Sequence, residues 1–297
     1  MEVYLLRVYS LVAIALAYML FDVFNKRNVP SYFVYATLAY GALLTVLYFN
    51  LYAIGFSALI AVVVLALGYI VYRAGQLGAA DVIELAALSL ILPLQKLPYL
   101  VGIPQLNLPF AVSLIINSGI AALVIVPIYY IPKAFSRRGK RSRMNFVDSA
   151  ITKKNMFKAV MVTVAYLALL LLVVFEFGAD NLGSALILVL LLGSVGVILF
   201  EDPITSLMVE RVSVDKFEPG DIIAINMMTK KEVLEIRRRF KGFGGLITDE
   251  TIKRFKEKRF RKKLPVYKRA IPFAVPIFIG VWISLFLGNL ILLLIPV

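Results

Sequence analysis

Long apolar runs separated by short polar segments dominate the pattern of this chain. They are 17–26 residues long, close to the roughly 17–25 residues that a helix needs to cross a bilayer. In chain order the runs are Tyr4–Phe21, Phe33–Phe49, Leu51–Tyr72, Gly78–Leu94, Pro109–Ile131, Phe157–Phe177, Leu182–Phe200 and Ile271–Pro296. The pattern predicts an all-α polytopic membrane protein with about eight transmembrane helices. No small-residue cleavage site follows the first run, so we interpret it as a retained helix and not as a signal peptide.

Composition supports this fold class and limits the chemistry. Hydrophobic residues make up 61% of the 297 residues, against about 45–50% in a soluble domain. The chain contains no cysteine and no histidine. Disulfides, thiol nucleophiles, histidine-dependent catalytic groups and HExxH zinc sites are therefore excluded. Any reaction must use Asp, Glu, Lys, Ser, Thr or Tyr, and we expect neither a metal nor a cofactor.

The net charge of +14 is distributed as membrane topology requires. The loop 133–158 carries many Lys and Arg and a single acid, Asp148, so the positive-inside rule places it in the cytoplasm. The same rule places the segment 201–269 in the cytoplasm and both termini outside, at the cell membrane. We interpret the basic run 253–263 as a helix facing lipid headgroups, and not as a nucleic-acid site.

The chain divides into four parts by this pattern. Residues 1–131 form the first five membrane helices, and 132–200 hold the basic loop and two additional helices. Residues 201–269 form a small cytosolic α+β insertion, and 270–297 the last membrane helix. In the insertion, RVSVDKF and IIAINMM resemble two strands joined by a turn at EPGD, and two charged helices follow. Three glycines separate those helices, and Thr248 with Thr251 begins the second; the glycines are Gly242, Gly244 and Gly245.

Two acids at the ends of apolar runs are candidates for chemistry. Asp22 ends the first run and Asp81 begins the fourth, and a carboxylate in a membrane helix costs about 2.5–3.5 kcal/mol at its centre, less at its edge. On the topology above, both lie at the cytoplasmic face, where a helix bundle can bring them together. Two adjacent carboxyls share a proton and can activate water without a metal or a covalent intermediate. Gly78 and the small Ala79 and Ala80 would let backbone approach Asp81.

The residues around these acids resemble a known family. DVFNKRNVP after the first run and GAAD before the fourth are similar to the paired motifs of archaeal type IV prepilin and preflagellin peptidases, which are GxGD aspartyl proteases. The archaeal branch often has a hydrophobic residue where Ala80 stands. RVSVDKFEPGDIIAINM, GLITDETIKRFK and IPFAVPIFIG resemble that family's cytosolic segment and last helix. We predict Asp22 and Asp81 as the catalytic pair, with these substrate-binding or supporting residues: Gly78, Ala80, Glu84, Lys26 and Arg27.

The resemblance implies a membrane aspartyl endopeptidase of an archaeon. Its expected substrates are pilin and archaellin precursors, cut on the cytoplasmic side between a basic leader and the apolar helix of a class III signal peptide. Two features depart from the family. The lysine that commonly follows the second aspartate is replaced by Val82-Ile83-Glu84, and the runs 157–177 and 182–200 exceed the usual six-helix plan.

Structural interpretations remain beside the catalytic one. Asp81-Val-Ile-Glu84 has the spacing of a capping box, with Asp81 as N-cap and Glu84 at N3, and Asp22 could balance Lys26 or Arg27. LGSVG at 192–196 indicates helix packing, and Pro272 and Pro276 can start or kink the last helix. The rival function is a proton- or ion-coupled transporter with intramembrane acids. A catalytically silent relative that binds pilin-like helices is a third.

Overall fold

The structure is a computed structural model, and most of the chain is described in it. The described residues are 2–25, 29–48, 51–73, 77–94, 108–136, 152–177, 182–240, 245–260, 262–268 and 271–294.

Every predicted apolar run contains an α-helix. In chain order these are α1 (Glu2–Phe24), α2 (Ser31–Tyr48), α3 (Leu51–Arg73), α4 (Ala79–Ile91), α5 (Phe110–Ser136), α7 (Lys153–Phe177), α8 (Leu182–Leu199) and α12 (Ala274–Leu287). In the described part of the chain, α1, α3, α5, α7 and α8 are long and apolar enough to cross a membrane, while α2 and α12 are apolar but shorter. The mostly helical, multi-pass architecture is confirmed, and the number of eight spans stays a prediction.

Helix α4 lies at the centre of the N-terminal bundle. Its residues from Glu84 to Ile91 are all buried, and α2 and α3 pack against it. Each of those helices places a glycine at the contact. A Cβ added to Gly41 would lie 3.0 Å from the Ala87 carbonyl oxygen, and one added to Gly68 would lie 2.4 Å from Val82 Cγ1. The absent side chains therefore allow the backbones to approach closely, as small residues do between membrane helices.

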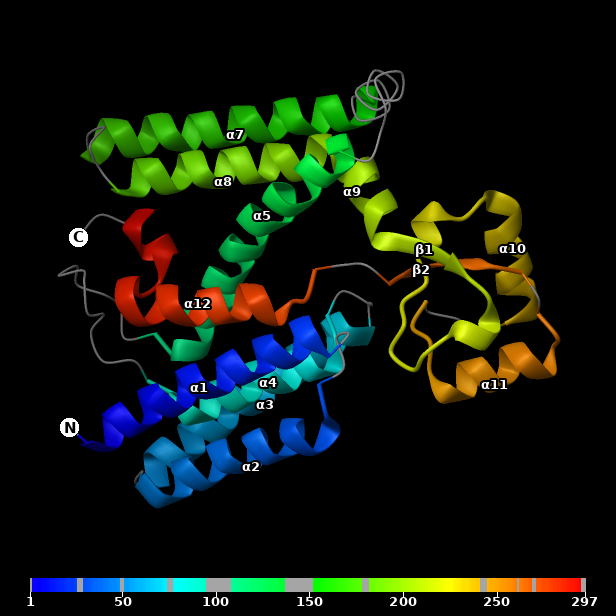
Figure 1. Cartoon of the computed structure of the whole chain (residues 1–297). Coiled ribbons are helices and arrows are strands. Elements are labelled where there is room, and N and C mark those ends of the chain that lie inside the picture. Colours follow the sequence, from blue (N-terminus) through cyan, green and yellow to red (C-terminus); the bar gives the residue numbers. More distant parts are fainter. Residues whose placement is uncertain are drawn as a thin grey trace.

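Helix α12 connects this bundle to the rest of the membrane region. It packs between α1 and α5, and α5 runs obliquely to the hairpin that α7 and α8 form (Figure 1). A Cβ on Gly280 of α12 would lie 2.3 Å from Ser118 Oγ of α5. In the N-terminal bundle, the buried Arg7 guanidinium donates to the Ile91 carbonyl at 2.7 Å and to the Leu44 carbonyl at 2.5 Å. One cation thereby joins α1 to the C-terminal ends of α4 and α2.

The prediction of one continuous last helix over 271–296 is wrong. α12 ends at Leu287, Gly288 takes a φ of 74°, and a 3-10 helix, η3 (Leu290–Leu294), follows. Asn117 of α5 stabilises the break, because its side-chain amide donates to the Gly288 carbonyl at 2.7 Å and accepts from the Leu290 N–H at 3.2 Å. Pro276 lies in the first turn of α12, where the missing N–H needs no partner, so it starts the helix without kinking it.

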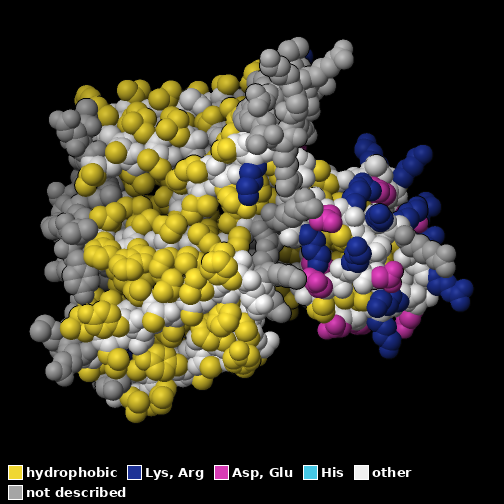
Figure 2. Space-filling view, viewed as in Figure 1, with side chains coloured by type: hydrophobic (Ala, Val, Ile, Leu, Met, Phe, Trp, Pro, Cys, Tyr) yellow, Lys and Arg dark blue, Asp and Glu magenta, His cyan; other side chains and the backbone are white. Residues whose placement is uncertain are grey.

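A small charged unit, residues 209–268, lies beside one end of the membrane helices (Figure 1). α9 (Glu201–Met208) continues from α8 and leads into it, and the unit contains β1 (Val209–Val212), η1 (Val214–Lys216), η2 (Ile225–Met227), α10 (Lys230–Arg239), α11 (Asp249–Glu257) and β2 (Leu264–Tyr267). Lys, Arg, Asp and Glu gather on its surface, whereas the visible face of the helices is apolar (Figure 2). The first residues of α1 and the end of η3 lie at the opposite end of the molecule (Figure 1).

The sheet of the charged unit differs from the predicted one. β1 pairs antiparallel with β2, from Val209 opposite Tyr267 to Val212 opposite Leu264, and not with the run IIAINMM. That run contributes only isolated bridges through Ile222 and Ile223. The turn before it explains the difference, because Gly220 has a φ of 95° and donates to the Ile247 carbonyl at 2.8 Å. The chain is thereby directed toward the residues before α11.

Two threonines begin the charged helices. Thr248 is the N-cap of α11 and accepts from the Thr251 N–H at 3.2 Å, as predicted. Gly245, with a φ of 93°, lies between the helices, while Gly242 and Gly244 lie outside the described residues. α11 ends at Glu257, so only the first part of the basic run 253–263 is helical.

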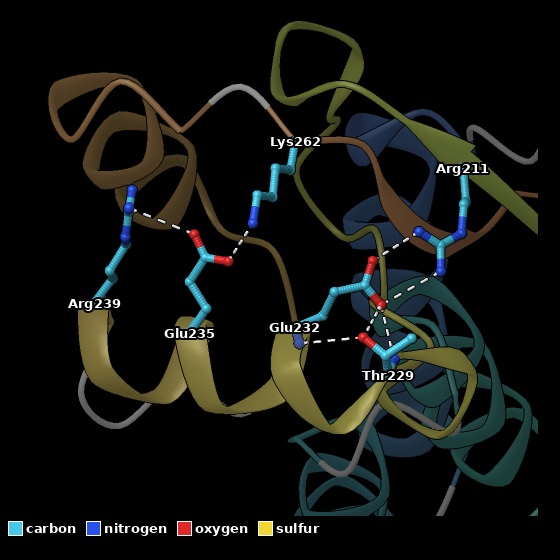
Figure 3. A network of polar contacts seen from close by, with 6 residues as sticks. All are labelled: Arg211, Thr229, Glu232, Glu235, Arg239 and Lys262. Carbon is cyan, nitrogen blue, oxygen red and sulfur yellow. Dashed lines mark hydrogen bonds and ion pairs between the residues drawn. The ribbon is translucent and has the colours of Figure 1, made fainter.

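Ion pairs tie α10 to the rest of the charged unit (Figure 3). Glu232 accepts from Arg211 of β1 at 2.8 Å and from the Thr229 N–H at 2.7 Å, which closes a capping box at the start of α10. One turn later, Glu235 accepts from Lys262 at 2.5 Å. Arg211 lies before the two charged helices in the chain and Lys262 lies after them, so these contacts join both flanks of the segment to α10.

Candidate active site

Asp22 and Asp81 lie at the same end of the N-terminal bundle. Asp22 is in the last turn of α1 and Asp81 is in the first turn of α4, and these two helices pack against each other. Both helix ends, together with the start of α12, face the charged unit (Figure 1). Asp22 is buried, and Asp81 is partly exposed.

The Asp22 carboxylate contacts the first residue of α12. The Ala274 N–H donates to Asp22 Oδ2 at 3.3 Å. The first N–H groups of a helix have no partner inside the helix, and the positive end of the helix dipole lies there. α12 therefore supplies both a donor and a favourable field to Asp22. The sequence interpretation missed this contact, because it joins residues 252 positions apart through a backbone group.

The Asp81 carboxylate is held by a backbone N–H at the start of α4, the helix to which it belongs. The helix begins at Ala79 with Gly78 as N-cap, and the Gly78 N–H donates to Asp81 Oδ2 at 3.0 Å. The predicted capping box is therefore wrong in register: Asp81 is at N3, not at the N-cap, and Glu84 lies one turn further along. A glycine N-cap has no side chain to offer, so only the half in which the N3 carboxylate reaches back is formed.

Gly78 leaves the space that the Asp81 carboxylate occupies. A Cβ built on Gly78 would lie 2.9 Å from Asp81 Oδ2, and apart from the chain neighbours of Gly78 no described residue other than Asp81 lies within 4 Å of it. With a φ of −74°, the backbone itself does not require glycine. The absence of a side chain at this position therefore matters for the carboxylate and not for the turn.

Apolar side chains from four helices form a cluster that includes Ala274, the donor to Asp22, and Ala80, the residue before Asp81. Tyr18, Val34 and Ala274 form a buried cluster, and Ala80 and Ile83 of α4 pack against it. The cluster brings α1, α2, α4 and α12 together at the end of the bundle where the aspartates lie. Ala80 thus has a packing role at this junction, which its small side chain allows.

Glu84 is the most deeply buried acid near the pair. Its side chain is 0% exposed, and neither carboxyl oxygen has a hydrogen-bond partner among the described residues. It lies within electrostatic range of both Asp81 and Asp22. Lys26 and Arg27, the predicted basic neighbours of Asp22, lie outside the described residues.

Comparison with known families identifies the region that carries this site. Residues 9–128 match the type IV leader peptidase family. The match includes both aspartates and confirms the resemblance to prepilin and preflagellin peptidases. Comparisons with curated proteins and with solved structures gave no match.

The leader peptidase region covers most of α1 through most of α5. It supports a leader-peptidase-like protease in a multi-pass membrane protein. The α7–α8 hairpin, the charged unit and α12 lie outside the matched residues. Ala274, the donor to Asp22, is therefore contributed by a part of the chain beyond the family match.

Two further observations define the surroundings of the site. Among the described residues, no group of three or more acidic side chains is arranged to hold a metal ion. Sequence reasoning also missed Tyr18, which is fully buried and lies four residues before Asp22 on α1. A hydroxyl on the same face of the helix as a buried acid was the signal that could have identified it.

Proposed function

We propose that this chain is a membrane aspartyl endopeptidase of the prepilin and preflagellin type, with Asp22 and Asp81 as its catalytic pair. The observation that carries the proposal is that the leader peptidase match contains two acids that the fold brings to one end of the bundle. Each of them accepts a backbone N–H at the start of a helix.

The proposed reaction needs one ionised and one protonated aspartate. The ionised carboxylate takes a proton from water, and the water oxygen attacks the scissile carbonyl carbon. The protonated carboxyl gives its proton to the carbonyl oxygen, which produces a tetrahedral diol. The carboxyl that took the water proton then gives it to the amide nitrogen, one diol hydroxyl returns its proton to the other carboxylate, and the C–N bond breaks to release an acid and an amine. No covalent enzyme intermediate forms.

The proposed substrates are precursors of pilins and archaellins. Their apolar helix would remain in the bilayer beside the enzyme, and the bond before it would lie at the membrane edge. The position of Asp22 and Asp81 at helix ends suits a bond at that depth. The charged unit at the same end supports a polar, cytoplasmic environment for the leader, consistent with the basic loop 133–158 and with external termini.

The transporter alternative predicts acids near the bilayer midplane and an internal repeat. Asp22 and Asp81 lie at helix ends, and the family match is to peptidases. These observations favour proteolysis. The catalytically silent relative is separated from the enzyme by the experiment that follows.

The test is cleavage of a precursor with a basic leader and an apolar helix by the purified protein in lipid vesicles. Asp22→Asn and Asp81→Asn should each abolish cleavage almost as completely as the double variant, because the two groups act as a unit. Asn preserves the shape of each side chain, so the variants should fold and bind the precursor. Asp202→Asn, at an exposed position of α9, is the matched control and should retain activity.

Two outcomes would contradict the proposal. Near-normal turnover of either single variant at matched protein level would show that the aspartates are structural. Binding of the precursor without any product from the unsubstituted protein, under conditions where a known leader peptidase cuts it, would support the silent relative.

A further inference from the structure

The acids near the membrane edge belong to a two-layer arrangement. On α1, Tyr18 precedes Asp22 by four residues, and on α4, Glu84 follows Asp81 by three. Residues at these spacings lie on the same face of a helix. Tyr18 and Glu84 are both 0% exposed, so each helix places an aspartate at its end and a second polar group one turn further inside.

Burial without a partner determines which form of Glu84 the inner layer can hold. Both oxygens of Glu84 lack a hydrogen-bond partner among the described residues. An ionised carboxylate without a donor is far more costly to bury than a neutral carboxylic acid. The described ion pairs include none with Glu84, so no cation in this part of the chain offsets that cost.

Among the described residues, the linked hydroxyls of Tyr18 and Thr37 do not offer Glu84 a donor. Thr37 donates its single hydroxyl proton to the Val34 carbonyl at 2.9 Å. In the 2.8 Å contact between Tyr18 and Thr37, Tyr18 must therefore be the donor. Tyr18 can then offer only oxygen lone pairs to a neighbouring group. Such an environment suits a carboxyl that carries its proton.

The outer layer has the opposite character. Asp22 and Asp81 each accept a backbone N–H at a helix start, from Ala274 and Gly78. The hydrogen bond and the positive end of the helix dipole both stabilise a negative charge on the carboxylate. The titratable groups that act on Glu84 are Asp81 on its own helix, and Asp22 and Tyr18 on α1. Negative charge is therefore favoured in the outer layer and a proton in the inner one.

We propose that Glu84 is a positioning residue of the site: a neutral carboxylic acid that holds a proton one turn inside Asp81 and acts through the aspartate pair. Its neutrality prevents a third negative charge from adding to the field at Asp22 and Asp81, so that the pair keeps one proton and one charge. Its effect on catalysis rests on the proposed function, whereas its protonation does not.

Infrared difference spectroscopy tests the protonation without any need for activity. The spectrum of the purified protein in lipid minus that of Glu84→Gln at neutral pH should contain the carbonyl stretch of a protonated carboxylic acid. Gln preserves the size of the side chain and cannot ionise. Glu257→Gln at the exposed end of α11 is the control and should give no such band. A carboxylate band in place of the acid band would overturn the proposal.

The pH profile of precursor cleavage tests the role in catalysis. If Glu84 is neutral, Glu84→Gln changes no charge. The acidic limb of the variant's pH profile should then coincide with that of the unsubstituted protein. Its alkaline limb should lie at the same or a lower pH, because no third negative charge can then form beside the aspartate pair and help it to keep its proton. An acidic limb displaced to lower pH would show that Glu84 is ionised and would refute the proposal. If the acid band is present but no precursor is cut, the proposed function fails while the protonation stands.

Discussion

Gly78 offers a sharp test of the proposed site, because among the described residues distant from it in the chain only Asp81 lies close to the missing side chain. In Gly78→Ala, the added Cβ would lie 2.9 Å from Asp81 Oδ2. The N-cap backbone, with φ −74° and ψ 154°, is allowed for alanine. The substitution should therefore disturb the carboxylate without disturbing the turn.

The expected loss of activity follows from this distance. Ordinary van der Waals contacts to a Cβ begin at 3.4 Å, so the Asp81 oxygen must retreat by about 0.5 Å. A misplacement of about 1 Å in an active site can lower the rate about 100-fold. On a logarithmic scale, half of that displacement corresponds to about a tenfold loss. The 3.0 Å hydrogen bond from the Gly78 N–H would also lengthen.

The assay is the initial rate of precursor cleavage at matched protein level, with precursor binding and thermal unfolding measured on the same samples. Gly119→Ala is the matched control, because a Cβ at that exposed position of α5 would meet no described residue within 4 Å apart from its chain neighbours and the backbone of its own helix. We expect both variants to fold and bind, and only Gly78→Ala to lose about a factor of ten. An unchanged rate in a folded Gly78→Ala would refute the assignment of Gly78 as the residue that makes room for the Asp81 carboxylate.

Three further predictions follow from the packing, the ion pairs and the topology. Gly68→Ala should destabilise the bundle by about 1–3 kcal/mol through overpacking, because the added Cβ would lie 2.4 Å from Val82 Cγ1. Adding Val82→Ala to that variant should restore part of the lost stability. Thermal unfolding measures both effects. Arg211 and the Thr229 N–H lower the pKa of Glu232 to about 2 from 4.5, so its contribution to stability is present above pH 4.5 and disappears toward pH 2. Hydrogen exchange of α10 should therefore accelerate over that range, less so in Glu232→Gln, while Glu250→Gln at an exposed pair should behave as the unsubstituted protein. Tags placed in 137–143 should be cytoplasmic and a tag at the C-terminus external; the reverse labelling would contradict the proposed face of cleavage.

Local patterns predicted the elements of this fold well. The apolar runs contain the membrane helices, and Thr248 starts α11 where the sequence placed it. These features depend on residues that are close in sequence. Asp22 and Asp81 could also be placed at one face, because helix length and loop charge determine on which side each helix ends.

The features that were not predicted depend on partners distant in sequence. Gly288 interrupts an otherwise apolar run, and the group that stabilises the interruption, Asn117, lies 171 residues earlier. The Leu264–Tyr267 strand lacks a clear alternating pattern and is recognised only by its pairing with β1. The register of α4 was missed for another reason: the D-x-x-E spacing resembles a capping box, whereas the true N-cap is a glycine, which has no side chain to indicate it.

The connection between β2 and α12 gives the charged unit a direct relation to the proposed catalytic pair. β2 ends at Tyr267, α12 begins at Ala274, and the Ala274 N–H is the donor to Asp22. Only a few residues therefore separate the last strand of the unit from a group that holds a proposed catalytic carboxylate. The leader peptidase match ends at residue 128, so it contains both aspartates but not this donor. The proposed site is consequently built from two distant parts of the chain, and the helix that completes it starts where the charged unit ends.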